Sequence, residues 1–302
     1  MIERAFQGYG ANPPDIRWPN GGRFAVSFVL NIEEGAELNI GDGDERNEAR
    51  HEVRQEVSGV PDLCTASHYE YSTRVGYWRV MREFERAGIP LTFNVCTRAL
   101  ERAPWIAEDG VRRGVEFMCH SYRWESHYPM TADHELKTIR KAAEGIRRLT
   151  GERPLGWHTR SSASVNTRRL IVEEGFLYDS DAYNDDLPYY VPVNGKPHLV
   201  VPYCFDTNDM RFHDSYAFTR GSDFADYTID AFDWLNAEAE HAPKMLSIGL
   251  HVRIISRAGR MAGLRTLLDH VRNAPGVWFA RRRDIARHWL NAVPPDRAAL
   301  SR

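Results

Sequence analysis

Short apolar runs alternate with amphipathic segments along nearly the whole chain of 302 residues. Several runs are apolar at almost every position, as in FAVSFVLNI at 24–32, a pattern typical of strands buried on both faces of a parallel sheet. The runs that we interpret as strands are 24–32, 90–96, 114–120, 154–159, 176–183, 198–205, 245–252 and 277–281.

The segments between these runs have the period of helices. In 133–151 the apolar residues recur every three or four positions, and we expect further helices at 76–88, 166–175, 265–273 and 283–291. This alternation predicts an α/β fold, a distorted parallel (β/α) barrel of about seven strands. An open doubly wound sheet is the alternative, but no G-x-G-x-x-G follows the first strand, which weakens its nucleotide-binding form.

The length suits a single catalytic domain over 1–302, in which 1–23 forms an irregular N-terminal arm rich in Gly, Pro and Asn. A net charge of −3 without a basic run argues against a nucleic-acid partner. The longest apolar stretch, around 24–30, is far too short to span a membrane. With no apolar leader and four widely spaced cysteines, we expect a cytoplasmic protein.

Polar residues follow most of the predicted strands. In parallel α/β folds, functional residues gather at the carboxyl ends of the strands, so these residues are expected to share one rim. Each has an ordinary explanation by itself, as a turn, a cap or a solvated corner, but together they predict an active site. They are Glu33, Glu34, His120, His158, Arg160, Asp179, Asp181, Asn184, Asn208 and His251.

These residues resemble the motifs of the polysaccharide deacetylase superfamily, a distorted barrel of parallel strands that hydrolyses amide bonds. Its T-F-D-D-G motif corresponds to 31–35, where Glu33 and Glu34 replace both aspartates. Its H-[ST]-x-x-H motif corresponds to 120–124, where Trp124 replaces the second histidine. Arg160 corresponds to the arginine motif, and the stretch that ends in Leu250-His251 to the closing Leu-x-His motif.

Longer segments are similar to the allantoinase-like proteins of purine catabolism and the related cyclic imide hydrolases. The similarity covers nearly the whole chain and includes 8–37, 69–80, 152–157, 166–190 and 197–212. The segments CHSYRWESHY and WHTRSSASVN differ from an allantoinase, in which a glycine follows the histidine and the arginine loop is shorter. The resemblance therefore does not imply allantoin itself as the substrate.

The resemblance implies roles for the matched residues. Glu33 would take a proton from water, and His251 would protonate the leaving nitrogen. Arg160 would orient a carboxylate or bind a substrate carbonyl, and His120 would polarise that carbonyl. The substrate-binding residues would be Trp124, Tyr122, His158, Asp181, Asn184 and Asn208.

The family's metal is held by one carboxylate and two histidines, and Glu34 and His120 match two of these ligands. Trp124 cannot ligate, so it either fills the space that a metal leaves or forms an apolar wall against a flat ring. One divalent metal such as zinc remains an alternative, with a third ligand from His127, His158 or His68. We favour metal-independent catalysis.

The predicted function is hydrolysis of a non-peptide carbon–nitrogen bond, which opens a small cyclic amide, ureide or imide similar to allantoin. An N-deacetylase of amino sugars is the alternative, and the missing second histidine argues against it. A non-catalytic ligand-binding relative is the third possibility, and the retained Glu33, His120, Arg160 and His251 argue against it. We expect a homo-oligomer, because small-molecule barrels of this branch often are and the arm could supply a contact.

Overall fold

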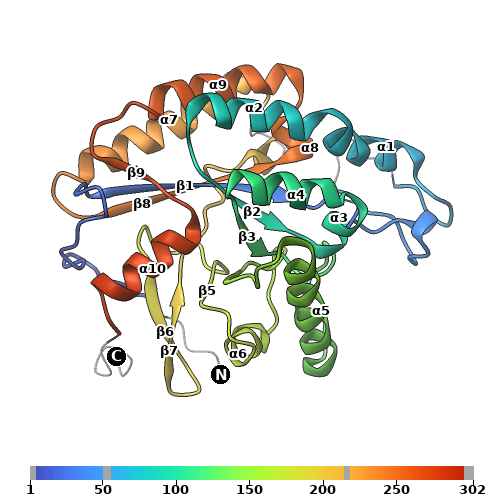
Figure 1. Ribbon diagram of the computed structural model, residues 1–302, viewed down its shortest axis with the longest axis horizontal. Coiled ribbons are helices and arrows are strands. Elements are labelled where there is room, and N and C mark those ends of the chain that lie inside the picture. The colour runs from blue at the N-terminus through green and yellow to red at the C-terminus, as the bar shows by residue number, and fades with distance from the viewer. Residues whose placement is uncertain (1–4, 50–55, 214–217, 296–302) are drawn as a thin grey trace.

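The structure, a computed structural model, describes residues 5–49, 56–213 and 218–295. Its strands form one curled sheet in the order β6-β7-β5-β4-β3-β2-β1-β8, and β9 also pairs with β1 (Figure 1). Every pairing is parallel except that of β6 with β7. The strands are β1 Phe24–Ile32, β2 Leu91–Val95, β3 Glu116–Cys119, β4 Gly156–Trp157, β5 Tyr178–Asp179, β6 Tyr189–Val193, β7 Lys196–Val200, β8 Lys244–His251 and β9 Val277–Phe279.

The predicted α/β fold with a barrel-like parallel sheet is confirmed. Each predicted run overlaps an observed strand; β1 has the predicted bounds, β8 has the predicted length, and the other observed strands are shorter. The hydrogen-bonded order of the strands begins at β6 and ends at β8, and the curled sheet forms a half-barrel. Strand β1 lies between β2 and β8, and all nine of its residues are buried. The residues that follow β1, Glu33 and Glu34, therefore emerge at the carboxyl edge of the sheet, beside the end strand β8.

Strand β6 is not among the predicted strands. It forms an antiparallel hairpin with β7 through Asn194 and Gly195, whose φ angles are 50° and 72°. Positive φ at both central residues is the requirement of the tight hairpin turn that matches the twist of the strands. Pro192 lacks a backbone N–H, which suits a strand at the end of the sheet order. Figure 1 shows this hairpin projecting away from the centre of the molecule.

Helices surround the sheet. α7 packs on β8, and α9 lies between α7 and α2, so these three helices cover one side of β1 and β8 (Figure 1). The helices are α1 Leu63–Tyr71, α2 Tyr77–Ala87, α3 Thr97–Arg102, α4 Pro104–Arg113, α5 Ala132–Thr150, α6 Thr167–Glu173, α7 Gly221–Glu238, α8 Val252–Ile255, α9 Ala258–Val271 and α10 Arg282–Ala292. A π-helical turn, η2 Ser72–Gly76, joins α1 to α2, and η1 Ile40–Asp42 and η3 Asp209–His213 are 3-10 helices.

The N-terminal arm contributes to the core. Residues 5–23 contain no helix or strand, and residues 1–4 of the predicted arm lie outside the described ranges. Trp18 is buried, and its ring centroid lies 5.7 Å from that of Trp278 and 5.9 Å from that of Trp289 in α10. The arm is thus fastened to its own chain by aromatic packing.

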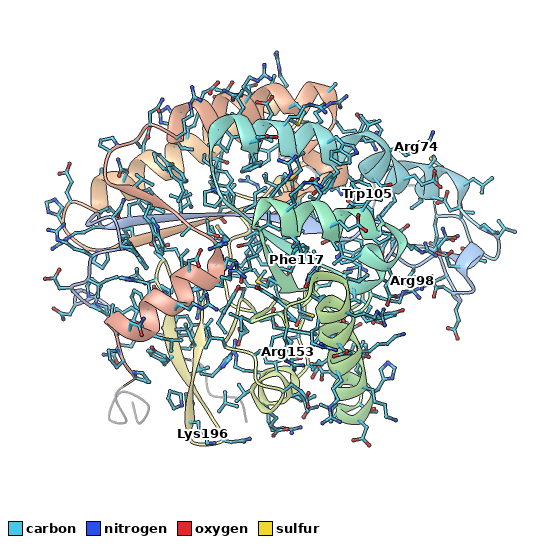
Figure 2. The ribbon with its side chains drawn as sticks, viewed as in Figure 1. Arg74, Arg98, Trp105, Phe117, Arg153 and Lys196 are labelled. Carbon is cyan, nitrogen blue, oxygen red and sulfur yellow. The ribbon has the colours of Figure 1, made fainter. Side chains whose placement is uncertain are left out.

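Side chains divide between the interior and the surface as the apolar pattern predicts. Phe117 of β3 lies inside the molecule, whereas Lys196, at the start of β7, points outward (Figure 2). Within the described ranges, no helix combines the length and apolar character needed to cross a membrane.

Candidate active site

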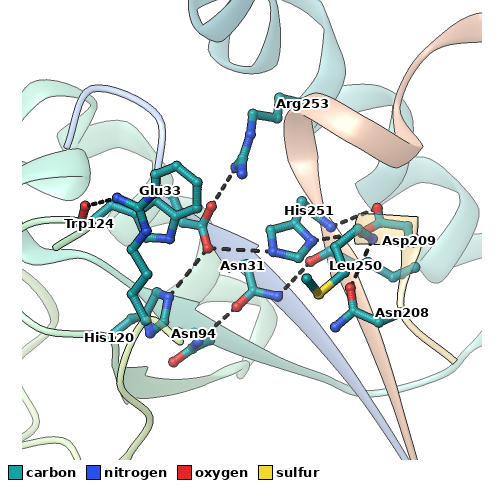
Figure 3. Close-up of polar contacts among 12 residues, drawn as sticks. Asn31, Glu33, Asn94, His120, Trp124, Asn208, Asp209, Leu250, His251 and Arg253 are labelled. Carbon is teal, nitrogen blue, oxygen red and sulfur yellow. Dashed lines mark hydrogen bonds and ion pairs between the residues drawn. The ribbon is translucent and has the colours of Figure 1, made fainter. Parts of the chain in front are cut away.

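A buried carboxylate lies where the carboxyl ends of β1, β3 and β8 meet. Glu33 follows β1 directly and is only 1% exposed. Its Oε1 atom lies 3.3 Å from Nε2 of His120, which follows β3, and 3.5 Å from Nε2 of His251, which ends β8. Its Oε2 atom accepts a 2.5 Å hydrogen bond from Nη1 of Arg253 (Figure 3). The structure therefore brings together the predicted Glu33, His120 and His251, and adds Arg253 to them.

Positive and proton-donating neighbours keep Glu33 ionised. Burial alone would raise the pKa of the carboxyl group, because it removes water from the charged form. The Arg253 guanidinium, with His251 and His120, outweighs burial and holds the pKa of Glu33 well below its ordinary value. Glu33 is thus ionised at neutral pH, which is the form that can accept a proton.

His251 is oriented by the carboxylate of Asp209, a contact that could not be predicted from the sequence. Its Nδ1 atom lies 2.7 Å from Oδ1 of Asp209, and its backbone N–H donates to Oδ2 of Asp209 at 2.8 Å. The Nε2 atom therefore faces Glu33. Burial lowers the pKa of His251, but Glu33 and Asp209 outweigh this and raise it above its usual value. A protonated imidazole beside a carboxylate is the arrangement that a general acid requires.

The segments after β3 and β4 hold His120 in place. Nδ1 of His120 lies 2.5 Å from the carbonyl oxygen of His158 and donates to it, since a carbonyl oxygen can only accept. The next residue, Ser121, has a φ of 70°, a left-handed conformation that glycine adopts more readily. Its hydroxyl lies 2.8 Å from Nε2 of His127. His127 is thus used to support the turn behind His120.

His158 is the neutral member of the histidine group. Its ring stacks on that of His120, with centroids 5.2 Å apart and planes 8° apart. Burial, followed by the neighbouring His120, lowers its pKa well below the usual value. Its Nδ1 atom lies 3.1 Å from Nδ2 of Asn94, and its Nε2 atom lies 3.1 Å from the hydroxyl of Tyr183. A neutral ring satisfies both contacts, because Nδ1 accepts and Nε2 donates.

Amide side chains connect the strand ends beneath these rings. Nδ2 of Asn94 donates to Oδ1 of Asn31 at 2.7 Å, and Nδ2 of Asn31 donates to the carbonyl of Leu250 at 3.0 Å (Figure 3). Asn31 also donates to the hydroxyl of Tyr203 at 3.1 Å. This chain fixes the spacing of β1, β2 and β8, and with it the distance between Glu33 and the histidines.

Asn208 reaches the same region from the segment after β7. It forms an isolated bridge with Gly249 of β8, and its Nδ2 atom lies 3.4 Å from the hydroxyl of Tyr203. A Cβ atom added at Gly249 would lie 2.2 Å from that Nδ2 atom, so the close approach requires glycine. The structure thus places Asn208 beside the amide chain.

Arg160 and Trp124 form one side of the site. The Arg160 guanidinium lies 3.5 Å from the centroid of the Trp124 ring and donates to the Trp124 carbonyl at 2.7 Å. It also pairs with both carboxylate oxygens of the buried Glu48, at 2.8 and 2.9 Å. The carboxylate that Arg160 holds in the structure is Glu48, whereas Glu33 is held by Arg253; binding of a substrate carbonyl by Arg160 stays a prediction.

Other predicted residues lie in supporting positions. Asp181 accepts from the backbone N–H and the hydroxyl of Thr159, at 2.6 and 2.7 Å, and thereby holds the segment after β4. Burial, followed by the charge of Asp179, raises the pKa of Asp181 to about 6. Asn184 is exposed, and its Oδ1 atom accepts from the hydroxyl of Tyr189 at 2.9 Å.

Three of the predicted aromatic or histidine contacts lie away from Glu33. The hydroxyl of Tyr122 donates to Glu101 of α3, and Lys141 of α5 lies over its ring, so the contacts of Tyr122 are with helices. The two ring nitrogens of His127 contact Glu135 at 2.9 Å and Ser121 at 2.8 Å. His68 contacts Arg257 at 2.7 Å. The structure does not bring these three to the cluster.

Comparison with known proteins now identifies the family. The sequence model described as polysaccharide deacetylase matches residues 62–175. A "putative polysaccharide deacetylase" of Schizosaccharomyces pombe is 35% identical, over 96% of this chain and 98% of that protein. This chain belongs to the polysaccharide deacetylase family. Family membership makes it a hydrolase of carbon–nitrogen bonds.

Solved structures resemble the whole chain. A "probable polysaccharide deacetylase" from Pseudomonas aeruginosa PAO1 has 45% identity and a TM-score of 0.93, over 98% of this chain and 100% of that one. PuuE allantoinase has 46% identity and a TM-score of 0.94, with the same coverage. A relative found by sequence, the peptidoglycan deacetylase of Helicobacter pylori, is 25% identical, over 74% of this chain and 87% of that protein.

The side chains present do not fit the metal site that the family implies. Oε1 of Glu34 accepts the backbone N–H of Arg253 at 2.9 Å, and its Oε2 accepts the backbone N–H of Glu33 at 3.2 Å. Each oxygen of the matched carboxylate thus already accepts a backbone hydrogen bond, and Trp124 offers no lone pair for a metal. Across the described ranges, no group of three or more His, Cys, Asp or Glu side chains is arranged to hold a metal ion.

Two important site residues were missed by sequence reasoning. Arg253 lies two positions after His251, just past a predicted strand. No pattern in the sequence indicated which residue it contacts. Asp209 follows Asn208 and was one of several acidic residues in a turn-like segment. Only the folded chain shows that both face the residues of β1 and β8.

Proposed function

We propose that the protein hydrolyses a small cyclic amide, ureide or imide and opens its ring by attack of water on a carbonyl carbon. The observation that carries this proposal is the burial of the reactive groups: Glu33, His120 and His251 are 1%, 2% and 8% exposed. A small ring can be enclosed by such groups, whereas a polymer needs a groove that leaves its ends in solvent. The likeness to PuuE allantoinase supports the same class of substrate.

In this proposal Glu33 takes a proton from the attacking water as the new C–O bond forms. The tetrahedral intermediate carries its negative charge on the former carbonyl oxygen. His120 can donate to that oxygen only with both ring nitrogens protonated, because its Nδ1–H already donates to the carbonyl of His158. His251, held by Asp209, then donates the Nε2 proton to the ring nitrogen as the C–N bond breaks. The product carries a new carboxyl group and an N–H on the same opened chain.

Trp124 supports a flat substrate. Its ring is held by the Arg160 guanidinium on one side, at 3.5 Å, and the Arg253 guanidinium lies 4.6 Å from its centroid. The two guanidinium groups fix the ring plane, and the 7% of the residue that stays exposed would form an apolar wall of the substrate site. A planar imide or ureide ring suits such a wall better than the puckered ring of a sugar.

An N-deacetylase is the second candidate, because the relatives from S. pombe, P. aeruginosa and H. pylori all carry deacetylase descriptions. A substrate panel separates the two. We expect ring opening of succinimide-, hydantoin- or dihydropyrimidine-type compounds or of allantoin, and no release of acetate from N-acetylated sugar oligomers. Release of acetate without ring opening would favour the deacetylase.

Variants test whether the proposed residues act in that reaction. Glu33→Gln and His251→Ala should each abolish most of the turnover, whereas Glu144→Gln, on the exposed face of α5, should not. Activity untouched by the first two substitutions would refute the mechanism.

We also propose that the protein is cytoplasmic and forms a homo-oligomer. Light scattering of the purified protein would measure the oligomeric state.

A further inference from the structure

A buried arginine stands among the positions that match the family's metal ligands. Arg253 lies in the short helix α8, two residues after the end of β8, and is 2% exposed. Its Nη1 atom lies 2.5 Å from Oε2 of Glu33 and 3.5 Å from Oε1 of Glu34. One guanidinium therefore contacts both carboxylates of the first motif.

Aromatic rings enclose the same guanidinium. Its central carbon lies 4.6 Å from the centroid of the Trp124 ring and 5.0 Å from that of Tyr69. Ring faces attract a cation, and a guanidinium is hydrated more weakly than an ammonium group, so arginine is suited to this enclosure. Trp124 stands where the family has its second histidine ligand. Of the three positions that match the ligands, Glu34 and Trp124 thus contact the guanidinium directly.

One donor of Arg253 has no acceptor in the part of the chain that the structure describes. Its Nε atom is buried and makes no hydrogen bond to any described residue. A buried N–H of a charged group without an acceptor is unfavourable, and such groups in native proteins are normally satisfied. An acceptor supplied by a bound molecule would remove this deficit. The carbonyl oxygen of an amide, or the oxyanion that forms from it, is an acceptor of the required kind.

We infer that the Arg253 guanidinium takes the place of the family's metal ion, as a fixed positive charge whose Nε–H binds the carbonyl oxygen of the substrate. The replacement of the metal is independent of the substrate, whereas the contact with a carbonyl oxygen rests on the function proposed above. Arginine keeps its charge throughout the physiological pH range and donates in a fixed plane. It needs no ligand set, and this explains why a tryptophan is tolerated at position 124.

Cobalt(II) titration tests the replacement. The probe is Co²⁺ added to the purified wild type, Trp124→His, Arg253→Ala and the double variant Trp124→His/Arg253→Ala, with visible absorption as the signal. We expect the double variant to bind one Co²⁺ per chain about 100-fold more tightly than the wild type or Trp124→His, because histidine restores a ligand and the guanidinium no longer occupies its place. Equal affinity of Trp124→His and the double variant would overturn the inference. So would tight binding of one Co²⁺ by the wild type.

Chemical rescue tests the contact with the substrate and does not depend on metal binding. Arg253→Ala should lose about 100-fold or more in kcat, as expected for the removal of a donor to an oxyanion. Added methylguanidinium should restore part of this activity, and Arg253→Lys should retain more activity than Arg253→Ala. Arg147→Ala is the matched control, because Arg147 is an exposed arginine that pairs with Glu144 on α5. Failure of methylguanidinium to restore activity to a folded Arg253→Ala variant would overturn the contact.

The two measurements separate this inference from the proposed function. If the wild type opens no cyclic amide, the proposed function fails, and the cobalt titration still decides whether Arg253 takes the place of the metal. Circular dichroism of each variant verifies the fold. Thermal unfolding with Co²⁺ adds a second readout, because a metal bound at the restored site should raise the melting temperature of the double variant alone.

Discussion

Nδ1 of His251 lies 2.7 Å from one carboxylate oxygen of Asp209, and the other oxygen accepts the backbone N–H of the same histidine at 2.8 Å. Two contacts from one aspartate leave the imidazole a single orientation, with Nε2 facing Glu33. The segment after β7 supplies this aspartate and β8 supplies the histidine. The acid of the proposed reaction is therefore assembled by the approach of two segments that are distant in the sequence.

The contact between Asp209 and His251 predicts how kcat depends on pH. Glu33 and Asp209 raise the pKa of His251 above its usual value, so the acid form is lost only as the pH rises through that raised pKa. Asp209→Asn removes one of these charges and should move the alkaline limb of the kcat profile to lower pH. It should also lower kcat by roughly 10²–10⁴-fold. Asp133→Asn, at an exposed position of α5, is the control, and identical profiles for the two variants would contradict the prediction.

The same shift predicts a stability change. A raised folded pKa means that the charged histidine stabilises the fold below its unfolded pKa of about 6.5, and that this contribution disappears as the pH rises through the folded value. The difference in unfolding free energy between the wild type and Asp209→Asn should therefore shrink from pH 6 towards pH 9. Denaturant unfolding at several pH values measures it.

Glu33 and Glu34 are adjacent but should respond differently to substitution. Glu33 is ionised by its neighbours, whereas burial raises the pKa of Glu34, whose oxygens accept two backbone N–H groups. Glu33→Gln should reduce kcat by roughly 10²–10⁴-fold. Glu34→Gln should cost about 1–3 kcal/mol of stability and change kcat by less than about tenfold, since one amide oxygen replaces two acceptors. If Glu33→Gln and Glu34→Gln lost activity equally, and added metal restored the activity of Glu34→Gln, Glu34 would be a metal ligand instead.

The central part of the site could be predicted from the apolar pattern. Buried parallel strands end at one edge, so residues at the ends of the runs that form β1, β3 and β8 were expected to share that edge. Glu33, His120 and His251 lie at such ends, and the strand order, which the pattern does not give, brings both histidines within 3.5 Å of Glu33. The same logic gives no information on side chains that reach the site from short helices or returning segments.

The remainder depends on long-range geometry. Arg160 and Glu48 are 112 positions apart, and no local pattern relates them. Arg253 reaches Glu33 because α8 turns at the end of β8, and a four-residue helix is too short to produce a periodic signal. Tyr122 lies in the matched motif but faces α3 and α5, since the chain after Ser121 turns through a left-handed conformation that spacing cannot disclose.

Glu135 of α5 connects the two segments that carry His120 and His158. Its carboxylate lies 2.9 Å from Nδ1 of His127 and accepts from the hydroxyls of Ser164 and Thr167, both at 2.5 Å. Glu135→Gln should lower the free energy of unfolding by about 3 kcal/mol, because it leaves a buried network without its charge. Exposed Glu144 provides the matched control, and Glu144→Gln should change stability by less than about 0.5 kcal/mol.

The sign of the pH dependence at Glu135 follows from its partners. Burial would raise its pKa, but the hydrogen bonds from His127, Ser164 and Thr167 outweigh this, so the pKa lies below the usual value. The contribution to stability is therefore full above the unfolded pKa of about 4.3 and is lost as the pH falls through the folded value. Unfolding of the wild type and Glu135→Gln should converge in acid. A constant difference from pH 7 to pH 3 would contradict this account.

Ser121 allows the backbone conformation behind His120 to be tested with two substitutions. Its φ of 70° is unfavourable for any residue with a Cβ atom, and its hydroxyl lies 2.8 Å from Nε2 of His127. Ser121→Ala and Ser121→Gly both remove this hydroxyl, so they differ only in the backbone. The glycine variant should be more stable by about 1 kcal/mol, because the left-handed strain of alanine exceeds the extra freedom that glycine gives the unfolded chain. Denaturant unfolding of the pair measures the difference, and an alanine variant of equal or greater stability would show that the turn stores no strain.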